Sequence, residues 1–205
     1  MLDTCPPDAS FVFQEMSWLD VRMLRLRLLG SPWWEEAANT QPGEISLICE
    51  GVEELNLSLR AGTLCSGLHL STDDPLLWEY GPFSTIFGTA PLPDPQRFFY
   101  EFYELVSHRL KVRRDPARYL NWESSLKEWE QYVYSRAYRL LSAPAPIAEA
   151  TIELLEVQAA EFTVLPDAEG NAPGEGERQE VPASALQVLS VGSCWIVAKG
   201  ISVEV

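Results

Sequence analysis

Apolar and polar residues alternate with a period of two along much of the first seventy residues. The alternation runs over residues 21–28, 44–50 and 55–59, and a shorter run follows at 64–70. One face of the first two runs carries Leu24, Leu26, Leu28, Ile45, Leu47 and Cys49. This period is typical of half-buried antiparallel strands. Gly51 interrupts the pattern, so it marks either a bulge within one bent strand or a turn between two strands.

The two ends of the chain give different predictions. Residues 1–15 contain adjacent prolines and show little periodicity, which predicts a loose lead-in. Near the other end, residues 185–191 and 194–198 flank a Gly-Ser pair and predict a hairpin with a glycine-first turn. A last strand follows at 201–205. Three short strands alone are marginal, so we expect them to return to the N-terminal sheet.

The middle of the chain carries helical signals instead. Asp94 followed by Pro95 predicts a helix start, with the helix ending near residues 111–114. Asp115-Pro116 repeats the start signal. The second predicted helix has an apolar stripe at Leu126, Trp129, Val133, Ala137 and Leu140, and a third has one at Ile147, Ala150, Leu154 and Val157. Five aromatic residues within 98–103 exceed one helical stripe, and core packing is favoured over partner binding for them.

These patterns predict one α+β domain spanning residues 1–205. A mainly antiparallel sheet from the N- and C-terminal strands would be covered by about three central helices, which form a helical insert at 94–158. Residues 167–180 contain no large apolar side chain and predict a mobile acidic loop.

Composition and charge limit the partners and the cellular location that we expect for this domain. The formal net charge is −15, which disfavours general binding to nucleic acid or to anionic lipid. No apolar run is long enough for a spanning helix, and the first residues lack the pattern of a secretory signal. Four cysteines are widely scattered, which is typical of reduced thiols. We therefore expect a cytoplasmic protein that does not engage a membrane.

The charge is distributed unevenly along the chain. Residues 97–139 sum to +3, whereas the remainder sums to −18. Four cations lie between the first two predicted helices, and aromatic residues follow them. Arginine beside an aromatic ring is suited to gripping a partner, so the predicted partner-binding residues are Arg113, Arg114, Arg118, Tyr119 and Trp122. The competing interpretation is a solvated cluster that closes one helix and pairs locally.

Candidate catalytic chemistry is sparse in this sequence. Cys65 and His69 are four residues apart with serines nearby, but residues at that spacing in an extended strand are roughly 13 Å apart. His108 is explained by its place near a helix C-terminus. No phosphate-binding loop, dinucleotide fingerprint or zincin motif occurs. We therefore assign no catalytic residue, metal ligand or cofactor.

The sequence favours a non-enzymatic domain that binds another protein. By analogy with other acidic domains that lack catalytic residues, it could act as an inhibitor, an antitoxin-like protein or an immunity protein. The alternative is a small hydrolase-type enzyme that uses carboxylates or the Cys65/His69 pair. A third hypothesis is nucleic-acid binding through residues 109–122, although the overall charge opposes it. The partner's identity and the oligomeric state are left open.

Overall fold

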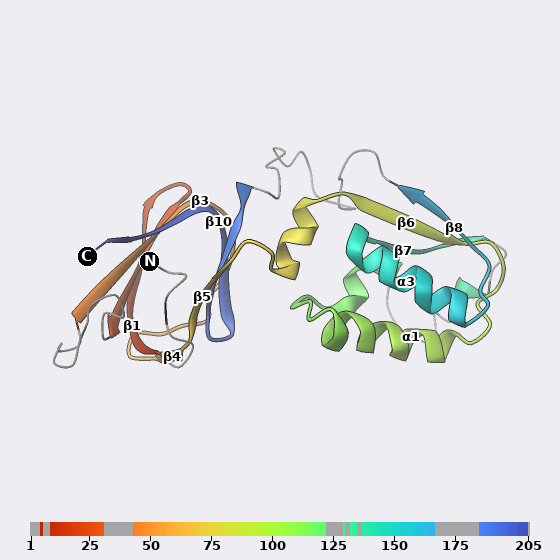
Figure 1. Cartoon of the computed structure of the whole chain (residues 1–205), viewed down its shortest axis with the longest axis horizontal. Coiled ribbons are helices and arrows are strands. Elements are labelled where there is room, and N and C mark those ends of the chain that lie inside the picture. Colours follow the sequence, from red (N-terminus) through yellow and green to blue (C-terminus); the bar gives the residue numbers. More distant parts are fainter. Residues whose placement is uncertain are drawn as a thin grey trace. The chain divides into compact units, whose positions relative to one another are not determined.

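The computed structural model describes residues 5, 9–30, 43–121, 129, 132–134, 137–166 and 185–204. The chain divides into two compact units, Met1–Leu77 with Ser184–Val205 and Trp78–Ala183, whose elements are labelled in Figure 1. Each unit has its own cluster of buried apolar side chains. The single domain over residues 1–205 stays a prediction, because separate cores do not show whether either unit folds alone.

The first unit is an antiparallel sheet that curls into a nearly closed barrel. Its described strands are β1 (Ser10–Asp20), β2 (Met23–Gly30), β3 (Gly43–Asn56), β4 (Leu64–Ser66), β5 (Leu68–Ser71), β9 (Gln187–Val191) and β10 (Cys194–Glu204). Their order is β4-β1-β2-β3-β10-β9-β5, so the two edge strands are neighbours in sequence. Only Gly67 separates them, with φ of +74°, a conformation that glycine adopts without a steric penalty. The chain therefore closes the barrel by bending at this residue.

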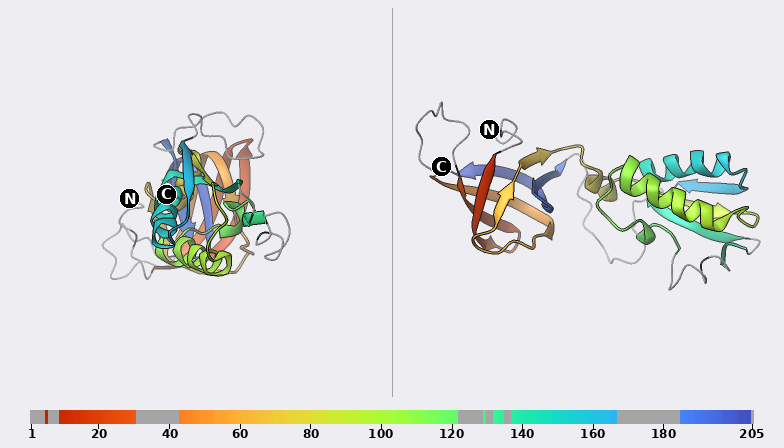
Figure 2. Two further views of the ribbon diagram at one scale, coloured as in Figure 1. Left: turned by 90° about the vertical axis from the view of Figure 1, so that its right-hand side faces the viewer. Right: turned by 90° about the horizontal axis from the view of Figure 1, so that it is seen from below.

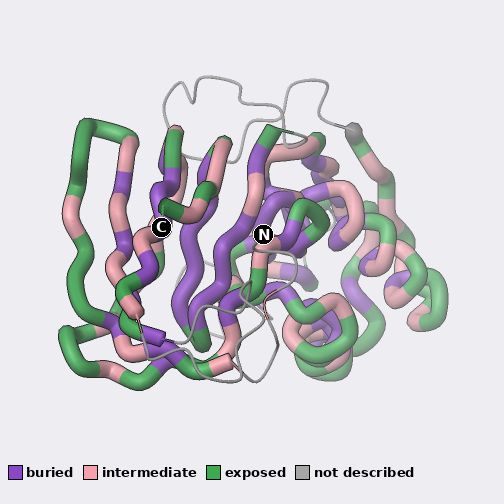
Figure 3. The backbone as a smooth tube through the Cα atoms, turned by 60° about the vertical axis from the view of Figure 1, so that its left-hand side comes forward, coloured by how far each residue is buried: buried purple, intermediate pink, exposed green. Residues whose placement is uncertain are grey.

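The predicted faces of β2 and β3 are confirmed. Leu24, Leu26 and Leu28 are buried in the barrel, and so are the apolar residues of the following strand. Between them, Arg27 faces outward and forms ion pairs with Glu15 at 2.9 Å and with Glu44. The alternation of buried and exposed positions along the strands is visible in Figure 3.

Two turn predictions are also resolved. Gly51 has φ of +62° and lies inside the single strand β3, next to a register shift against β10, so the bulge interpretation is correct. Gly192 opens the two-residue turn between β9 and β10 with φ of +60°. Strand β10 then pairs with β3 from Trp195 to Glu204, which confirms that the C-terminal strands return to the N-terminal sheet.

The loose lead-in over residues 1–15 is wrong from Ser10 onward, where β1 begins. Phe11 and Phe13 point into the barrel and are buried. The alternation of apolar residues around them is short and ends at a bulge after Phe13. The sequence pattern therefore does not reveal this strand. Of residues 1–8, only Cys5 belongs to the described part, and the predicted loop at 167–180 lies outside it.

The second unit has its own three-stranded antiparallel sheet. Its order is β7-β6-β8, from β6 (Phe83–Gly88), β7 (Tyr138–Pro144) and β8 (Phe162–Pro166). Helices α1 (Pro95–Glu104) and α3 (Ala145–Val157) lie side by side (Figure 2), and α1 continues as one π-helical turn, Leu105–Arg109. A six-residue 3-10 segment covers Pro75–Tyr80, and a three-residue one covers Pro116–Arg118.

Buried side chains join these helices to their sheet. Phe98 and Phe102 of α1, with Ile147 and Leu155 of α3, belong to one core that includes Ile86 of the central strand. The predicted start of α1 is confirmed, because the Asp94 side chain accepts a hydrogen bond from the Arg97 backbone N–H at 3.0 Å. Four of the five clustered aromatic residues are buried or pack against this core, and the ring of Tyr100 is exposed.

The predicted α+β class with helices covering the N- and C-terminal sheet is wrong. Among the described residues the structure is mostly β, with 48% strand and 26% helix, and α1 and α3 pack on the sheet of the second unit. The predicted second helix fails at both ends. Asp115 caps only the three-residue 3-10 segment Pro116–Arg118, after which Leu120 forms a β-bridge with Leu141. At the other end, Leu140 lies in β7. This strand is buried on both faces from Leu140 to Pro144, and an apolar run of that kind cannot be told from a buried helix by periodicity. The insert at 94–158 therefore contains a strand.

Gly30 and Gly43 face each other across β2 and β3, but their surroundings differ. A Cβ added to Gly30 would lie 2.5 Å from the Phe11 ring, whereas a Cβ on Gly43 would meet nothing within 4 Å. We expect Gly30→Ala to lower the free energy of unfolding by about 1–3 kcal/mol through overpacking. Gly43→Ala should be neutral or slightly stabilising. Urea denaturation of both variants measures the difference, and equal losses would contradict this account of the barrel.

Candidate functional site

Three of the five predicted partner-binding residues meet at one buried carboxylate. Glu79, in the Pro75–Tyr80 segment, is only 8% exposed. It accepts a hydrogen bond from the Tyr119 hydroxyl at 2.7 Å. The Nε of Arg114 and an Nη of Arg118 lie 3.6 and 3.4 Å from its two carboxylate oxygens. The guanidinium of Arg118 also lies 5.9 Å from the centre of the Tyr119 ring.

These contacts stabilise the buried carboxylate of Glu79 within the fold. A carboxylate removed from water is costly unless charges and donors surround it, and this cluster supplies two guanidinium groups and a hydroxyl. Burial, and the charge of Glu79, raise the pKa of Tyr119 far above its usual range, so the phenol remains a neutral donor. Arg113 is exposed, and Trp122 lies outside the described residues. Binding of a partner by these residues, or of nucleic acid by residues 109–122, stays a prediction.

The structure does not bring Cys65 and His69 to a common site. Cys65 is buried in the barrel core, whereas His69 is exposed. Burial raises the pKa of the Cys65 thiol, and it raises that of Cys49 to about 12, which lowers the fraction of reactive thiolate in both. None of the four cysteines forms a disulfide, as expected for reduced thiols. Among the described residues, no group of three or more candidate ligands is placed to hold a metal ion.

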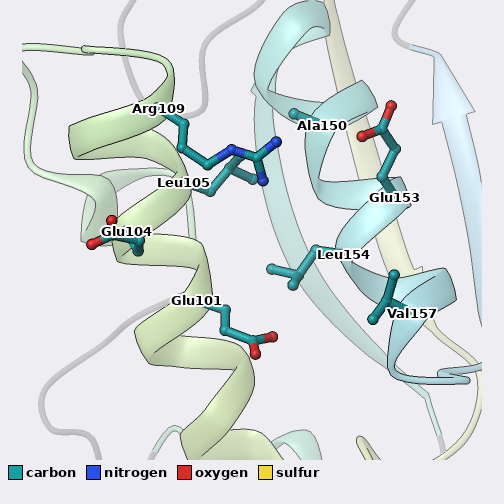
Figure 4. A pocket seen from close by; sticks show the side chains of 8 residues that line it. All are labelled: Glu101, Glu104, Leu105, Arg109, Ala150, Glu153, Leu154 and Val157. Carbon is teal, nitrogen blue, oxygen red and sulfur yellow. The ribbon is translucent and has the colours of Figure 1, made fainter.

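A groove of about 360 Å³ runs between α1 with its π-helical turn and α3 (Figure 4). Eight residues line it: Glu101, Glu104, Leu105, Arg109, Ala150, Glu153, Leu154 and Val157. The groove exists because the opposite faces of both helices are committed to the sheet. Its floor is apolar, since Leu105 is buried and Leu154 is half-buried.

Glu101 is the most firmly held carboxylate of the groove. It accepts hydrogen bonds from Arg97 Nε and from Gln158 Nε2, both at 2.8 Å. These two donors, with Arg97 the stronger, hold the pKa of Glu101 below its usual range. Because Gln158 follows α3, the carboxylate also ties the two helices together at one end of the groove. Glu101 therefore remains ionised at neutral pH in a fixed orientation.

The other charged residues of the groove are more exposed. The Arg109 guanidinium extends toward α3 near Ala150, and the Glu153 carboxylate stands at the outer lip of the groove (Figure 4). Glu104 points away from α3, and its carboxylate lies 4.0 Å from His108. Within the described part of the chain, Arg109 has no hydrogen bond or ion pair. The groove thus offers an available cation at one end and carboxylates elsewhere.

Neither Glu79 nor the groove was found from the sequence. Glu79 lies between two aromatic residues with no charge pattern around it, and its contact with Tyr119 spans forty positions. The third predicted helix, with its apolar stripe at Ile147, Ala150, Leu154 and Val157, corresponds to α3. The arrangement of α1 beside α3 depends on the intervening strand β7, which the sequence analysis misassigned.

Comparison with protein-family models, with curated proteins and with solved structures found no match to this chain. The described helices are all too short or too polar to cross a bilayer. Assignment of function therefore depends on the geometry of the groove and of the exposed surfaces.

Replacing Tyr119 tests whether the Glu79 cluster stabilises the fold. Tyr119→Phe removes one donor from a buried carboxylate, and we expect a loss of about 1–3 kcal/mol in the free energy of unfolding. Tyr103→Phe is the matched control, because its hydroxyl donates to the exposed Asp115 at 3.1 Å and water can replace it. Urea denaturation compares the two variants. Equal stability of wild type and Tyr119→Phe would show that the cluster contributes nothing to folding.

Proposed function

We propose that this chain is a non-enzymatic protein-binding domain. Its binding site is the groove between α1 and α3, and its ligand is a basic amphipathic helix of a partner protein. The observation that carries this proposal is an apolar groove floor bordered by carboxylates. This combination is the complement of a helix with apolar residues on one face and lysine or arginine beside them.

The groove offers apolar surface to the side chains of such a helix. Val157 is 74% exposed at the end of α3, and Leu154 is half-buried beside it. These positions are one turn apart, so they present one continuous strip beside Leu105. Covering that strip with leucine-sized side chains would remove apolar surface from water on both partners.

The charge of the groove selects a basic partner. Helix α3 carries three glutamates and no lysine or arginine, and α1 adds Glu101 and Glu104 near the groove. The whole chain has a net charge of −15, which extends the attraction to longer range. Complementary charge of this kind raises association rates and disfavours acidic competitors.

Arg109 gives the proposed complex an orientation. It is exposed at the end of the π-helical turn and extends into the groove. A guanidinium is suited to the unpaired carbonyls and negative dipole at the C-terminus of a helix. The partner helix would therefore place its C-terminus near Arg109 and its basic flank beside Glu153.

The test uses a short synthetic amphipathic helix with leucines on one face and lysines on the other, followed by fluorescence anisotropy. We expect binding that weakens as salt rises, because exposed charges are screened. Glu153→Lys should weaken it by about fivefold, the equivalent of about 1 kcal/mol. Glu156→Lys is the control, since it changes the net charge identically on the same helix but does not line the groove.

Two results would contradict the proposal. Equal binding of a peptide with glutamates in place of the lysines would show that charge does not select the partner. Equal weakening by Glu153→Lys and Glu156→Lys would show that the chain's overall charge, and not the groove, attracts the peptide.

A further inference from the structure

The C-terminal half of β1 is an open edge of the barrel sheet. Strand β4 pairs with β1 only from Ser10 to Val12, and two further backbone hydrogen bonds end at Phe13. Beyond that point, residues 15–20 pair with β2 on one side and with no other strand in the described part of the chain. Such an edge presents unpaired backbone N–H and C=O groups that another strand can use.

Between its two carboxylates, Glu15 and Asp20, this edge carries apolar side chains, and it lacks the lysine or proline that protects many edge strands. Met16 is 39% exposed and Trp18 is 50% exposed, and both lie on the face of Leu26 and Leu24, their partners in β2. The register irregularities of β1 fall before Glu15 and after Trp18, so the segment between them is regular strand.

We propose that a second copy of this chain pairs with this edge, so that two β1 strands meet antiparallel about a two-fold axis at Ser17. In this register, Met16 of each copy faces Trp18 of the other, and Glu15 faces Leu19. Side chains of the same face therefore stay together, and no two carboxylates are directly opposite. The thioether of Met16 against the indole ring is a favourable contact on each side of the axis.

The self-complementarity of the edge is the reason to choose a second copy over another protein. A two-fold interface requires that the same short surface match itself, and residues 15–19 meet this requirement in the register given above. The interface is small, so we expect a weak dimer. Each chain carries a net charge of −15, so repulsion opposes pairing and added salt strengthens it. This interface lies in the first unit and does not depend on the groove of the second unit.

Cysteine cross-linking tests the register. In a Cys5→Ser background, Ser17→Cys places two thiols directly across the axis, where the Cα separation of paired strands suits a disulfide. Glu15→Cys is the matched control, because position 15 would lie about 13 Å from its copy. With oxidised glutathione, we expect dimer to form roughly tenfold faster for Ser17→Cys, as a high effective concentration of thiol requires. Equal rates, or faster cross-linking at position 15, would overturn the proposal.

Sedimentation equilibrium of the unmodified chain provides a second measurement that needs no variant. The dimer fraction should rise with concentration, and it should rise further between low and moderate salt. A monomer at every concentration and salt condition would overturn the proposal. So would a dimer that dissociates as salt is added, because opposite charges would then hold the interface.

Discussion

The second unit depends on burying one face of α1 and one face of α3 against a sheet of only three described strands. Phe98 and Phe102 occupy the α1 side of that core, and Ile147 and Leu155 occupy the α3 side. Fixing these faces leaves the remaining surfaces of the two helices facing each other across a groove. The Glu101–Gln158 hydrogen bond then holds the helices together at one end. The proposed binding site is thus a consequence of how the core is filled.

The first unit must also bury the apolar face of its sheet, but it does so without α-helices among its described residues. There the sheet covers its own apolar face by curling until β4 and β5 meet at Gly67. Closure is incomplete, because β4 is short and leaves the far half of β1 without a neighbour among the described strands. Met16 and Trp18 stay accessible for this reason. In both units, the surface proposed for association is one that the unit's own core and strand pairing leave uncovered: the groove between α1 and α3, and the second half of β1.

Several local sequence signals predicted local structure correctly. The alternation around Leu26, the Asp94 cap and the glycine-first turn at Gly192 each depend on a few adjacent residues. Features that depend on long-range pairing were missed or misassigned. The apolar stripe of the second predicted helix ends at Leu140, inside β7, because that strand is buried on both faces. No local signal marks Glu79, because its partner Tyr119 is distant in sequence. The groove could not be found without the correct assignment of β7.

The central claim is that the groove between α1 and α3 is the recognition surface of this domain. The most direct measurement is mapping of backbone amide chemical shifts while the basic amphipathic peptide is added. This account predicts that the changes concentrate at residues 101–109 and 150–157. Changes that concentrate at residues 113–119, with the groove unaffected, would contradict it and would assign recognition to the arginine cluster around Glu79.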